Sequence, residues 1–296
     1  MAENLISDRE SLIKRAAILR ITASSLASAM QSGAFRSLYR GRGIEFAGVR
    51  EYLRGDDVRA IDWNVTARFS KPFVKMFNEE RELQIFLILD RSLSMQEGAK
   101  NKSRLESATE IAALLTLAAE RNSSPVGVAL FSGDIEFAVQ PKNSANQTLL
   151  LLSRLDEPPK KSKGTALSAS INGSGKLLKK RSLVFILSDF RAGGWEYAFA
   201  RLASRHDVVA VRITDSVDSS LPEIGTVVMR DPESGTRRLF PTMSKTFRGQ
   251  WREDAAMRAK RWNDAVLRRG GIPLSVSTSE DPLSALLAFF SQREIA

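Results

Sequence analysis

The chain of 296 residues has no cysteine and a single histidine, His206. Without cysteine the protein forms neither disulfides nor thiolate metal sites, so its fold suits a reducing compartment. Ser-His-Asp and Cys-His catalysis need a general base, and His206 is the only imidazole in the chain. Because His206 opens a predicted strand beside Asp207, we expect it to be structural. These absences argue against hydrolases of both types.

Long hydrophobic runs are also absent. No stretch approaches the roughly 18 uncharged apolar residues that a membrane helix needs, and the first residues lack the basic start and apolar core of a secretory signal. We therefore expect a soluble cytoplasmic protein with no membrane span.

Acidic residues are fewer than basic ones, 34 against 44, which gives a formal net charge of +10. Such a balance is compatible with a nucleic acid, an anionic membrane or an acidic protein as partner. Much of the excess lies on a predicted helix at residues 244–269, where apolar residues recur at helical spacing and arginines occupy the other faces. We favour a solvated helix face here over a polyanion site.

From residue 82 onward, apolar strands alternate with helical segments, which predicts an α/β domain with a doubly wound, mostly parallel sheet. Strands are expected near residues 84–90, 125–132, 182–188, 207–213 and 272–277. Helices are expected near residues 103–121, 144–155, 165–179, 195–204, 244–269 and 282–292. Turn residues predict two hairpins, one at Gly133-Asp134 and one joining 226–230 with 236–240.

The segment before residue 82 has a different pattern. Residues 9–31 are predicted to be a helix, and residues 33–80 a small β-rich arm whose aliphatic and aromatic content is too high for disorder. The expected division is an N-terminal helix and arm over residues 1–81 and the α/β domain over residues 82–296.

Oxygen-bearing side chains follow the predicted strands at the points where those strands end. Asp90, Ser92 and Ser94 come directly after the first strand, Asp189 ends another, and Thr165 is predicted to cap a helix between them. In open α/β sheets ligands bind beyond the carboxyl ends of the strands, and Mg²⁺ prefers oxygen ligands. Each residue by itself could merely serve a turn or a helix cap. Their combination favours a site for Mg²⁺ or Mn²⁺.

The order Asp-x-Ser-x-Ser, then Thr, then Asp resembles the metal-ion-dependent adhesion site of von Willebrand factor A-type domains. The resemblance implies that Asp90, Ser92, Ser94, Thr165 and Asp189 hold the ion, some of them through water, and that a partner carboxylate completes its coordination. Phe190 departs from the pattern, because glycine is common after the last Asp of that motif.

The arm carries a longer set of motifs. Those motifs are Gly43-x-Glu45-Phe46, Arg50-Glu51-Tyr52, Gly55-Asp56-Asp57-x-Arg59-x-Ile61-Asp62-Trp63 and Thr66-Ala67-Arg68. With them, the chain resembles the bacterial domain-of-unknown-function family numbered 58. That resemblance implies a von Willebrand A-like adaptor working with a MoxR-type AAA+ ATPase. The charged residues of the arm could dock it on the domain or recognise a partner.

We therefore expect a non-enzymatic protein-interaction module that acts in protein remodelling or maturation. Two alternatives stay open: a nucleic-acid-binding protein using the basic helix and the arm, and a metal-dependent hydrolase using Asp90 and Asp189. Gly173-Ser174-Gly175-Lys176 is not a P-loop, because Ser170 replaces its first glycine and Leu177 its ion-binding hydroxyl.

Overall fold

The computed structural model describes residues 26–28, 30, 45–69, 71–78, 83–98, 102–159, 164, 166–230, 232 and 235–291. They form two compact units, one within Tyr39–Glu82 and the other within Met1–Leu38 and Leu83–Ala296. We call them the small unit and the sheet unit. The expected domain division at residue 82 stays a prediction.

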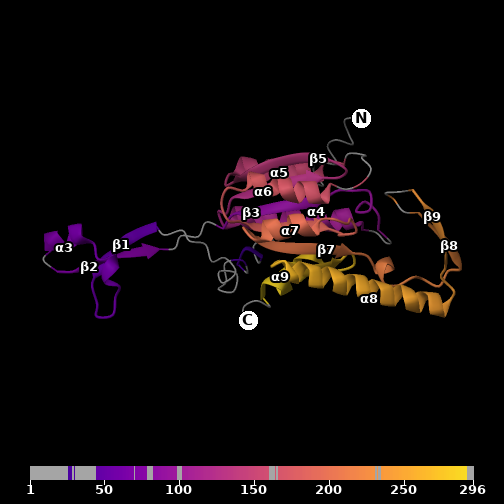
Figure 1. Cartoon of the computed structure of the whole chain (residues 1–296). Coiled ribbons are helices and arrows are strands. Elements are labelled where there is room, and N and C mark those ends of the chain that lie inside the picture. The colour runs from indigo at the N-terminus through magenta and orange to yellow at the C-terminus, as the bar shows by residue number, and fades with distance from the viewer. Residues whose placement is uncertain are drawn as a thin grey trace, which may run out of the picture. The chain divides into compact units, whose positions relative to one another are not determined.

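The sheet unit is built on a six-stranded sheet in the order β10-β7-β6-β3-β4-β5 (Figure 1). Its strands are β3 (Ile85–Asp90), β4 (Val126–Phe131), β5 (Ile135–Lys142), β6 (Leu183–Ser188), β7 (Asp207–Thr214) and β10 (Ile272–Ser277). Every pairing is parallel except that of β4 with the edge strand β5. β3, β4 and β6 are buried along their whole length, which explains their unbroken apolar sequences.

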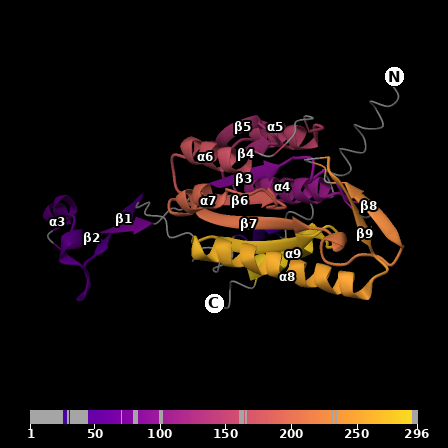
Figure 2. The same ribbon diagram turned by 45° about the vertical axis from the view of Figure 1, so that its right-hand side comes forward.

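Helices cover both faces of this sheet, as Figures 1 and 2 show. One face packs against α4 (Arg104–Arg121), α5 (Ala145–Asp156) and α9 (Pro282–Ser291), and the other against α6 (Leu167–Leu177), α7 (Glu196–Ala203) and α8 (Lys245–Arg268). Alternate residues of a strand serve opposite faces: Leu87 lies in the first core and Phe86 in the second. The predicted doubly wound α/β fold is therefore confirmed.

Part of the predicted N-terminal helix belongs to the first of these cores. Residues 26–28 and 30 are helical, and Leu26, Ala27 and Met30 are buried against α4 and its neighbours. The Asn122 side-chain amide, just beyond α4, donates to the Ala27 carbonyl at 3.1 Å. The other residues of the predicted helix lie outside the described part of the chain.

Serine caps begin three of the helices. Ser103 forms a capping box with Glu106 at α4, and Ser144 and Ser244 accept from backbone N–H groups at the starts of α5 and α8. The start of α6 differs from the prediction, since the helix begins at Leu167 and its N-cap is Ala166, not Thr165. Ala166 cannot cap with its side chain, and its N–H instead donates to the Ser132 carbonyl at 2.7 Å.

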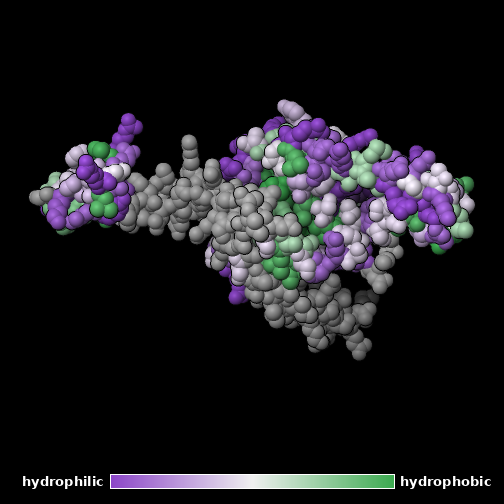
Figure 3. Space-filling model, turned by 90° about the horizontal axis from the view of Figure 1, so that it is seen from below, coloured by the Kyte–Doolittle hydropathy of each residue, from purple (hydrophilic) through white to green (hydrophobic). Residues whose placement is uncertain are grey.

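A two-stranded ribbon, β8 (Thr226–Arg230) with β9 (Arg237–Pro241), extends from the sheet unit as predicted (Figures 1 and 2). Phe240 of this ribbon packs on Phe247 and Trp251 of α8, with ring centroids 5.9 and 5.5 Å away. Most residues of the ribbon are exposed, and Figure 3 shows a largely hydrophilic surface at the right of the view, the side on which the ribbon and the start of α8 lie. In the middle of α8 the predicted apolar side is confirmed, because Trp262 and Val266 are buried while Arg258 and Arg261 are exposed.

The small unit contains β1 (Glu45–Glu51), the 3-10 helix η1 (Val58–Ala60), α3 (Trp63–Phe69) and β2 (Phe73–Asn78). β1 and β2 pair antiparallel, so the predicted small strands are present. Arg50 holds Asp56 through two hydrogen bonds of 2.7 Å. This fork holds the turn after β1 and lowers the pKa of Asp56 to about 2.

None of the described helices combines the length and the apolar character that crossing a membrane requires.

Candidate functional site

The candidate site lies where the chain changes direction across the sheet. From β3 the chain proceeds to β4 on one side, and it later returns as β6 on the other side of β3. Asp90 is the last residue of β3 and Asp189 follows the last residue of β6. The two aspartates therefore stand at the carboxyl ends of neighbouring parallel strands, at the switch point where such sheets bind ligands.

Three of the residues predicted for the site are brought together after β3. The Asp90 Oδ1 atom accepts from the Ser92 N–H at 3.0 Å, and the Ser92 and Ser94 Oγ atoms are 3.2 Å apart. All three are buried. They present a carboxylate and two hydroxyls within one short loop.

Ser188 is a further member of this group that the sequence analysis did not identify. Its Oγ donates to the Asp90 Oδ2 atom at 2.6 Å and accepts from the Phe190 N–H at 3.1 Å. The parallel register of β3 with β6 brings Ser188 beside Asp90, since Leu89 is paired with Leu187. The sequence did contain a signal for Ser188, because a hydroxyl stands at the last position of β6, directly before Asp189.

The Asp90 carboxyl group is almost completely buried. Burial raises its pKa to about 6, and the neighbouring charge of Asp189 acts in the same direction, while the hydrogen bonds from Ser188 and Ser92 lower it. A cation beside Asp90 would offset the cost of burying the carboxylate.

Asp189 contributes an unsatisfied oxygen atom. Its Oδ1 accepts from the Arg191 N–H at 3.0 Å, whereas the buried Oδ2 has no hydrogen-bond partner within the described residues. The Arg191 Nε lies 3.5 Å from Oδ2, which makes an ion pair without hydrogen-bond geometry. Buried polar atoms are normally hydrogen-bonded, so a free carboxylate oxygen here is a possible ligand for a cation.

Thr165, the remaining predicted ligand, lies outside the described residues. Its neighbour Ala166 is bonded to Ser132, the residue that follows β4. The residue after Thr165 is thus held next to the carboxyl end of β4, the strand that pairs with β3.

Phe190 stabilises the loop that carries Asp189. Its φ is 53°, in the left-handed region that a residue with a side chain rarely adopts. Its buried ring packs on Trp195 and Trp262, at centroid distances of 5.1 and 5.6 Å. Aromatic packing therefore holds a backbone shape for which the resembling motif commonly uses glycine.

Arginines surround the carboxyl ends of β6 and β7. Arg191 is half-exposed, Arg258 is exposed, and Arg212 lies with its guanidinium 5.7 Å from the Trp262 ring centroid. Burial lowers the pKa of Arg212, as do the positive charges of Arg191 and Arg258, while the charges of Asp218 and Asp189 raise it. We call these three arginine side chains the arginine rim, because they bring positive charge close to Asp189.

The buried side chain of Arg104 connects the loop after β3 to Asp218. The Arg104 guanidinium donates to Asp218 at 2.7 Å and to the Ser94 carbonyl at 3.2 Å. Arg191 also pairs with Asp218. Asp218 thus connects the loops that follow β3 and β6.

The oxygen donors found here fit a hard cation, with two carboxylates and two hydroxyls from two loops. Sites with three or more His, Cys, Asp or Glu side chains are not found in the part of the chain that the structure describes. Any ion held here would therefore depend on hydroxyls and on ligands from outside.

Residues 48–261 match the family described as "Protein of unknown function DUF58". The chain belongs to this family. It is similar to the uncharacterized protein Rv1480 of Mycobacterium tuberculosis strain H37Rv and to the uncharacterized protein Mb1516 of Mycobacterium bovis. Each is 30% identical over 280 residues, which cover 93% of this chain and 87% of the relative.

Among solved structures, the chain is similar to the conserved hypothetical protein BatB from Bacteroides thetaiotaomicron. That likeness has a TM-score of 0.49 at 19% identity and covers 72% of this chain and all of the other.

Proposed function

We propose that this member of the DUF58 family is a non-enzymatic protein-interaction module whose contact with its partner depends on Mg²⁺ or Mn²⁺. The observation that carries the proposal is the buried Asp189 Oδ2, which accepts no hydrogen bond from the described residues, near the cluster of Asp90, Ser92 and Ser94. These residues, with Thr165, would hold the ion. When bound, the ion would supply a positive centre that attracts a carboxylate of the partner.

The arginine rim supports an acidic partner. The charges of Asp189, Asp218, Arg191 and Arg258 all act on Arg212, so guanidinium groups lie close to the carboxylates of the proposed ion site. A partner segment with several Asp or Glu side chains would place one carboxylate on the ion and others on the rim, with bidentate hydrogen bonds from the guanidinium groups.

Membership of the family supports a MoxR-type AAA+ ATPase as the partner, since this association is what the family resemblance implies. The pair would act in remodelling or maturing other proteins. A hydrolase would use the same two carboxylates, but the only imidazole of the chain, that of His206, lies at the other end of the sheet, before β7, too far away to act as a general base beside them.

Ion binding is tested first, by thermal unfolding in EDTA and in about 10 mM Mg²⁺. With a dissociation constant on the order of 0.1 mM, the wild type gains about 2.7 kcal/mol, which raises the midpoint by roughly 5 to 10 °C. Asp90→Asn gains nothing, while Asp207→Asn, a carboxylate at the opposite end of the sheet, responds like the wild type. Equal behaviour of all three proteins contradicts the ion site.

Partner binding is tested with the purified MoxR-type ATPase of the same organism. We expect retention of the ATPase by the wild type and by Asp207→Asn in Mg²⁺, and at least tenfold weaker retention by Asp90→Asn or in EDTA. Retention that is equally strong in EDTA contradicts the bridging mechanism. A normal thermal response without retention rejects the ATPase and leaves the ion site intact.

A further inference from the structure

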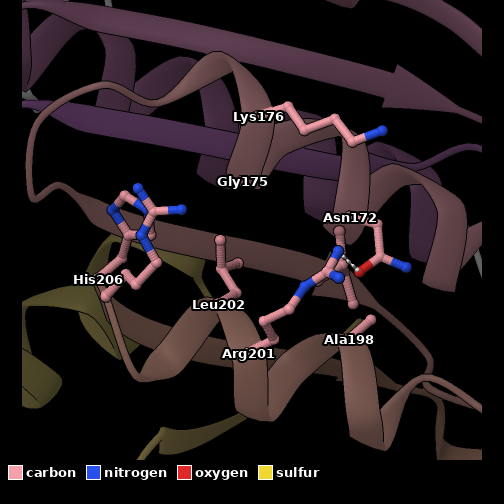
Figure 4. A pocket seen from close by; sticks show the side chains of 9 residues that line it. Asn172, Gly175, Lys176, Ala198, Arg201, Leu202 and His206 are labelled. Carbon is pink, nitrogen blue, oxygen red and sulfur yellow. Dashed lines mark hydrogen bonds between the residues drawn. The ribbon is translucent and has the colours of Figure 1, made fainter.

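A basic cavity lies between α6 and α7, near the amino ends of the strands. Its volume is about 260 Å³, and its charged lining consists of Lys176 from α6, Arg201 from α7, and Arg205 after α7. No Asp or Glu is among its described lining residues. Figure 4 shows Lys176 on the α6 side and Arg201 on the α7 side, with Leu202 between them.

A buried hydrogen-bond donor belongs to His206, which lines one side of the cavity (Figure 4). His206 is buried, and its Nδ1 atom accepts from the Ser182 N–H at 3.3 Å. The neutral ring therefore carries its proton on Nε2. The buried Nε2 has no partner within the described residues, although His206 lines the cavity. A buried N–H of this kind is normally bonded to an acceptor.

The neighbouring charges keep the ring neutral. Burial lowers the pKa of His206, and the positive charges of Arg205 and Arg181 act in the same direction, against Asp207. Arg181 and Asp207 are themselves joined by two hydrogen bonds of 2.9 and 2.6 Å. Asp207 is thus already occupied, and it does not neutralise the cations of the cavity.

The cations of the cavity differ in how they are engaged. Arg201 donates to the Asn172 side-chain oxygen at 2.7 Å, which is a neutral partner (Figure 4). Lys176 and Arg205 are exposed side chains of the lining. Between them the wall is apolar, formed by Ile171, Ala198 and Leu202. The cavity thus combines three cations and one neutral donor with an apolar wall.

We propose that this cavity binds a small organic phosphate, with the phosphate group on Arg205, Lys176 and the His206 Nε2–H and the organic part against Leu202. Arginine forks and lysine ammonium groups are the usual ligands of phosphate oxygens. The three positive charges of the cavity suit a phosphate group with two negative charges better than a carboxylate with one. The apolar wall gives inorganic phosphate nothing to contact and favours a ligand with a hydrocarbon or aromatic part.

The cavity is separate from the proposed ion site. His206 precedes β7 and Asp189 follows β6, and these strands are paired in parallel from Leu183 with Asp207 to Ser188 with Arg212. Five strand intervals at about 3.3 Å each separate the two ends, a distance of roughly 17 Å. Ligands of the two sites would therefore not touch.

The test uses the full chain and phenyl phosphate as the probe. Binding is measured by calorimetry at constant ionic strength, with inorganic phosphate and benzoate as comparison ligands. We expect phenyl phosphate to bind more tightly than either of them. Arg205→Gln and Lys176→Gln should each weaken it about tenfold or more, since hydrogen bonds between charged groups contribute at least 1.4 kcal/mol, the equivalent of tenfold.

The matched control is Lys179→Gln, an exposed lysine that follows α6 and does not line the cavity. It should bind phenyl phosphate like the wild type. If Lys179→Gln weakens binding as much as Arg205→Gln, the phosphate is attracted by the general positive charge of the surface, and the proposed binding in the cavity is wrong. Equal affinities for phenyl phosphate and inorganic phosphate would overturn the proposal that the ligand has an organic part.

A second readout reports on the imidazole directly. Because His206 is the only histidine, protein labelled with nitrogen-15 histidine gives the ring signals of this one residue. Phenyl phosphate should shift the Nε2 signal in the wild type and in Lys179→Gln, and not in Arg205→Gln at the same concentration. An unchanged Nε2 signal at saturating phenyl phosphate would overturn the assignment.

Discussion

The two ends of the parallel sheet carry opposite chemistry. Beyond the carboxyl ends of β3 and β6, buried carboxylates and hydroxyls face one another, and one Asp189 oxygen accepts no hydrogen bond from the described residues. Near the amino ends of β6 and β7, cations and a buried N–H donor line a cavity between helices. Between these two ends, β6 is apolar from Leu183 to Leu187. A sheet of this kind provides two separate places for polar chemistry: the carboxylates of the first follow strands, whereas the cations of the second come from α6, from α7 and from the residues after α7.

The ends also differ in how an arginine is paired with an aspartate. At the carboxyl end, the Arg104 and Asp218 side chains are 4% and 17% exposed, whereas at the amino end Arg181 and Asp207 are 47% and 14% exposed. Solvent screens the second pair and hardly reaches the first.

Replacing these arginines should give the largest effect. Arg104→Ala removes the donor of the Ser94 carbonyl and the buried one of the two arginines that pair with Asp218, so we expect a loss of about 3 kcal/mol or more in the free energy of unfolding. Arg181→Ala should lose less than about 1 kcal/mol, because its guanidinium is largely solvated. Urea unfolding measures both. Similar losses for the two variants would show that the loop after β3 does not depend on its buried ion pair.

The second prediction concerns the pH dependence of stability in EDTA. The pKa of Asp90 is about 6 in the folded chain and about 3.9 in an unfolded one. The protonated carboxyl group stabilises the fold below pH 4, and this contribution is lost as the pH rises through 6. Relative to Asp90→Asn, the wild type should therefore be about 2 kcal/mol less stable at pH 8 than at pH 4.

Urea unfolding of both proteins at these two pH values provides the measurement. Adding Mg²⁺ at pH 8 should recover part of the difference in the wild type alone. A difference between wild type and Asp90→Asn that does not change with pH would mean that Asp90 is not desolvated as the structure indicates.

The smallest effect concerns the backbone at Phe190. Both Phe190→Ala and Phe190→Gly lose the ring contacts with Trp195 and Trp262, but glycine adopts a φ of 53° without strain. We expect Phe190→Gly to be about 1 kcal/mol more stable than Phe190→Ala. At Phe199, buried within α7, the order should be reversed by a similar amount. Thermal unfolding of the four variants tests this, and the same order at both positions would contradict it.

Much of the fold could be predicted from local pattern. The unbroken apolar runs at Ile85–Asp90 and Leu183–Ser188 identified central strands, and the turn at Gly133-Asp134 identified the antiparallel edge. The start of α6 could not be predicted, because a bond from Ala166 to Ser132, far away in sequence, begins that helix in place of a side-chain cap.

The candidate site was predicted in part. Asp90, Ser92 and Ser94 are close in sequence and lie together in the structure, while Thr165 lies outside the described residues. Ser188 and the arginine rim were not predicted, because their closeness to Asp90 and Asp189 follows from strand pairing and from helix packing on the sheet. The ion itself stays a prediction.

The sequence by itself determined the strands, most of the helices and the polar residues that end the strands, because hydrophobic periodicity and turn chemistry are local properties. It also determined the excess of positive charge and the single histidine. Only the tertiary structure decided which polar side chains lie together. Ser188 donates to Asp90, Arg104 pairs with Asp218, and His206 lines a basic cavity. These encounters depend on strand order and helix packing, which bring together residues about a hundred positions apart.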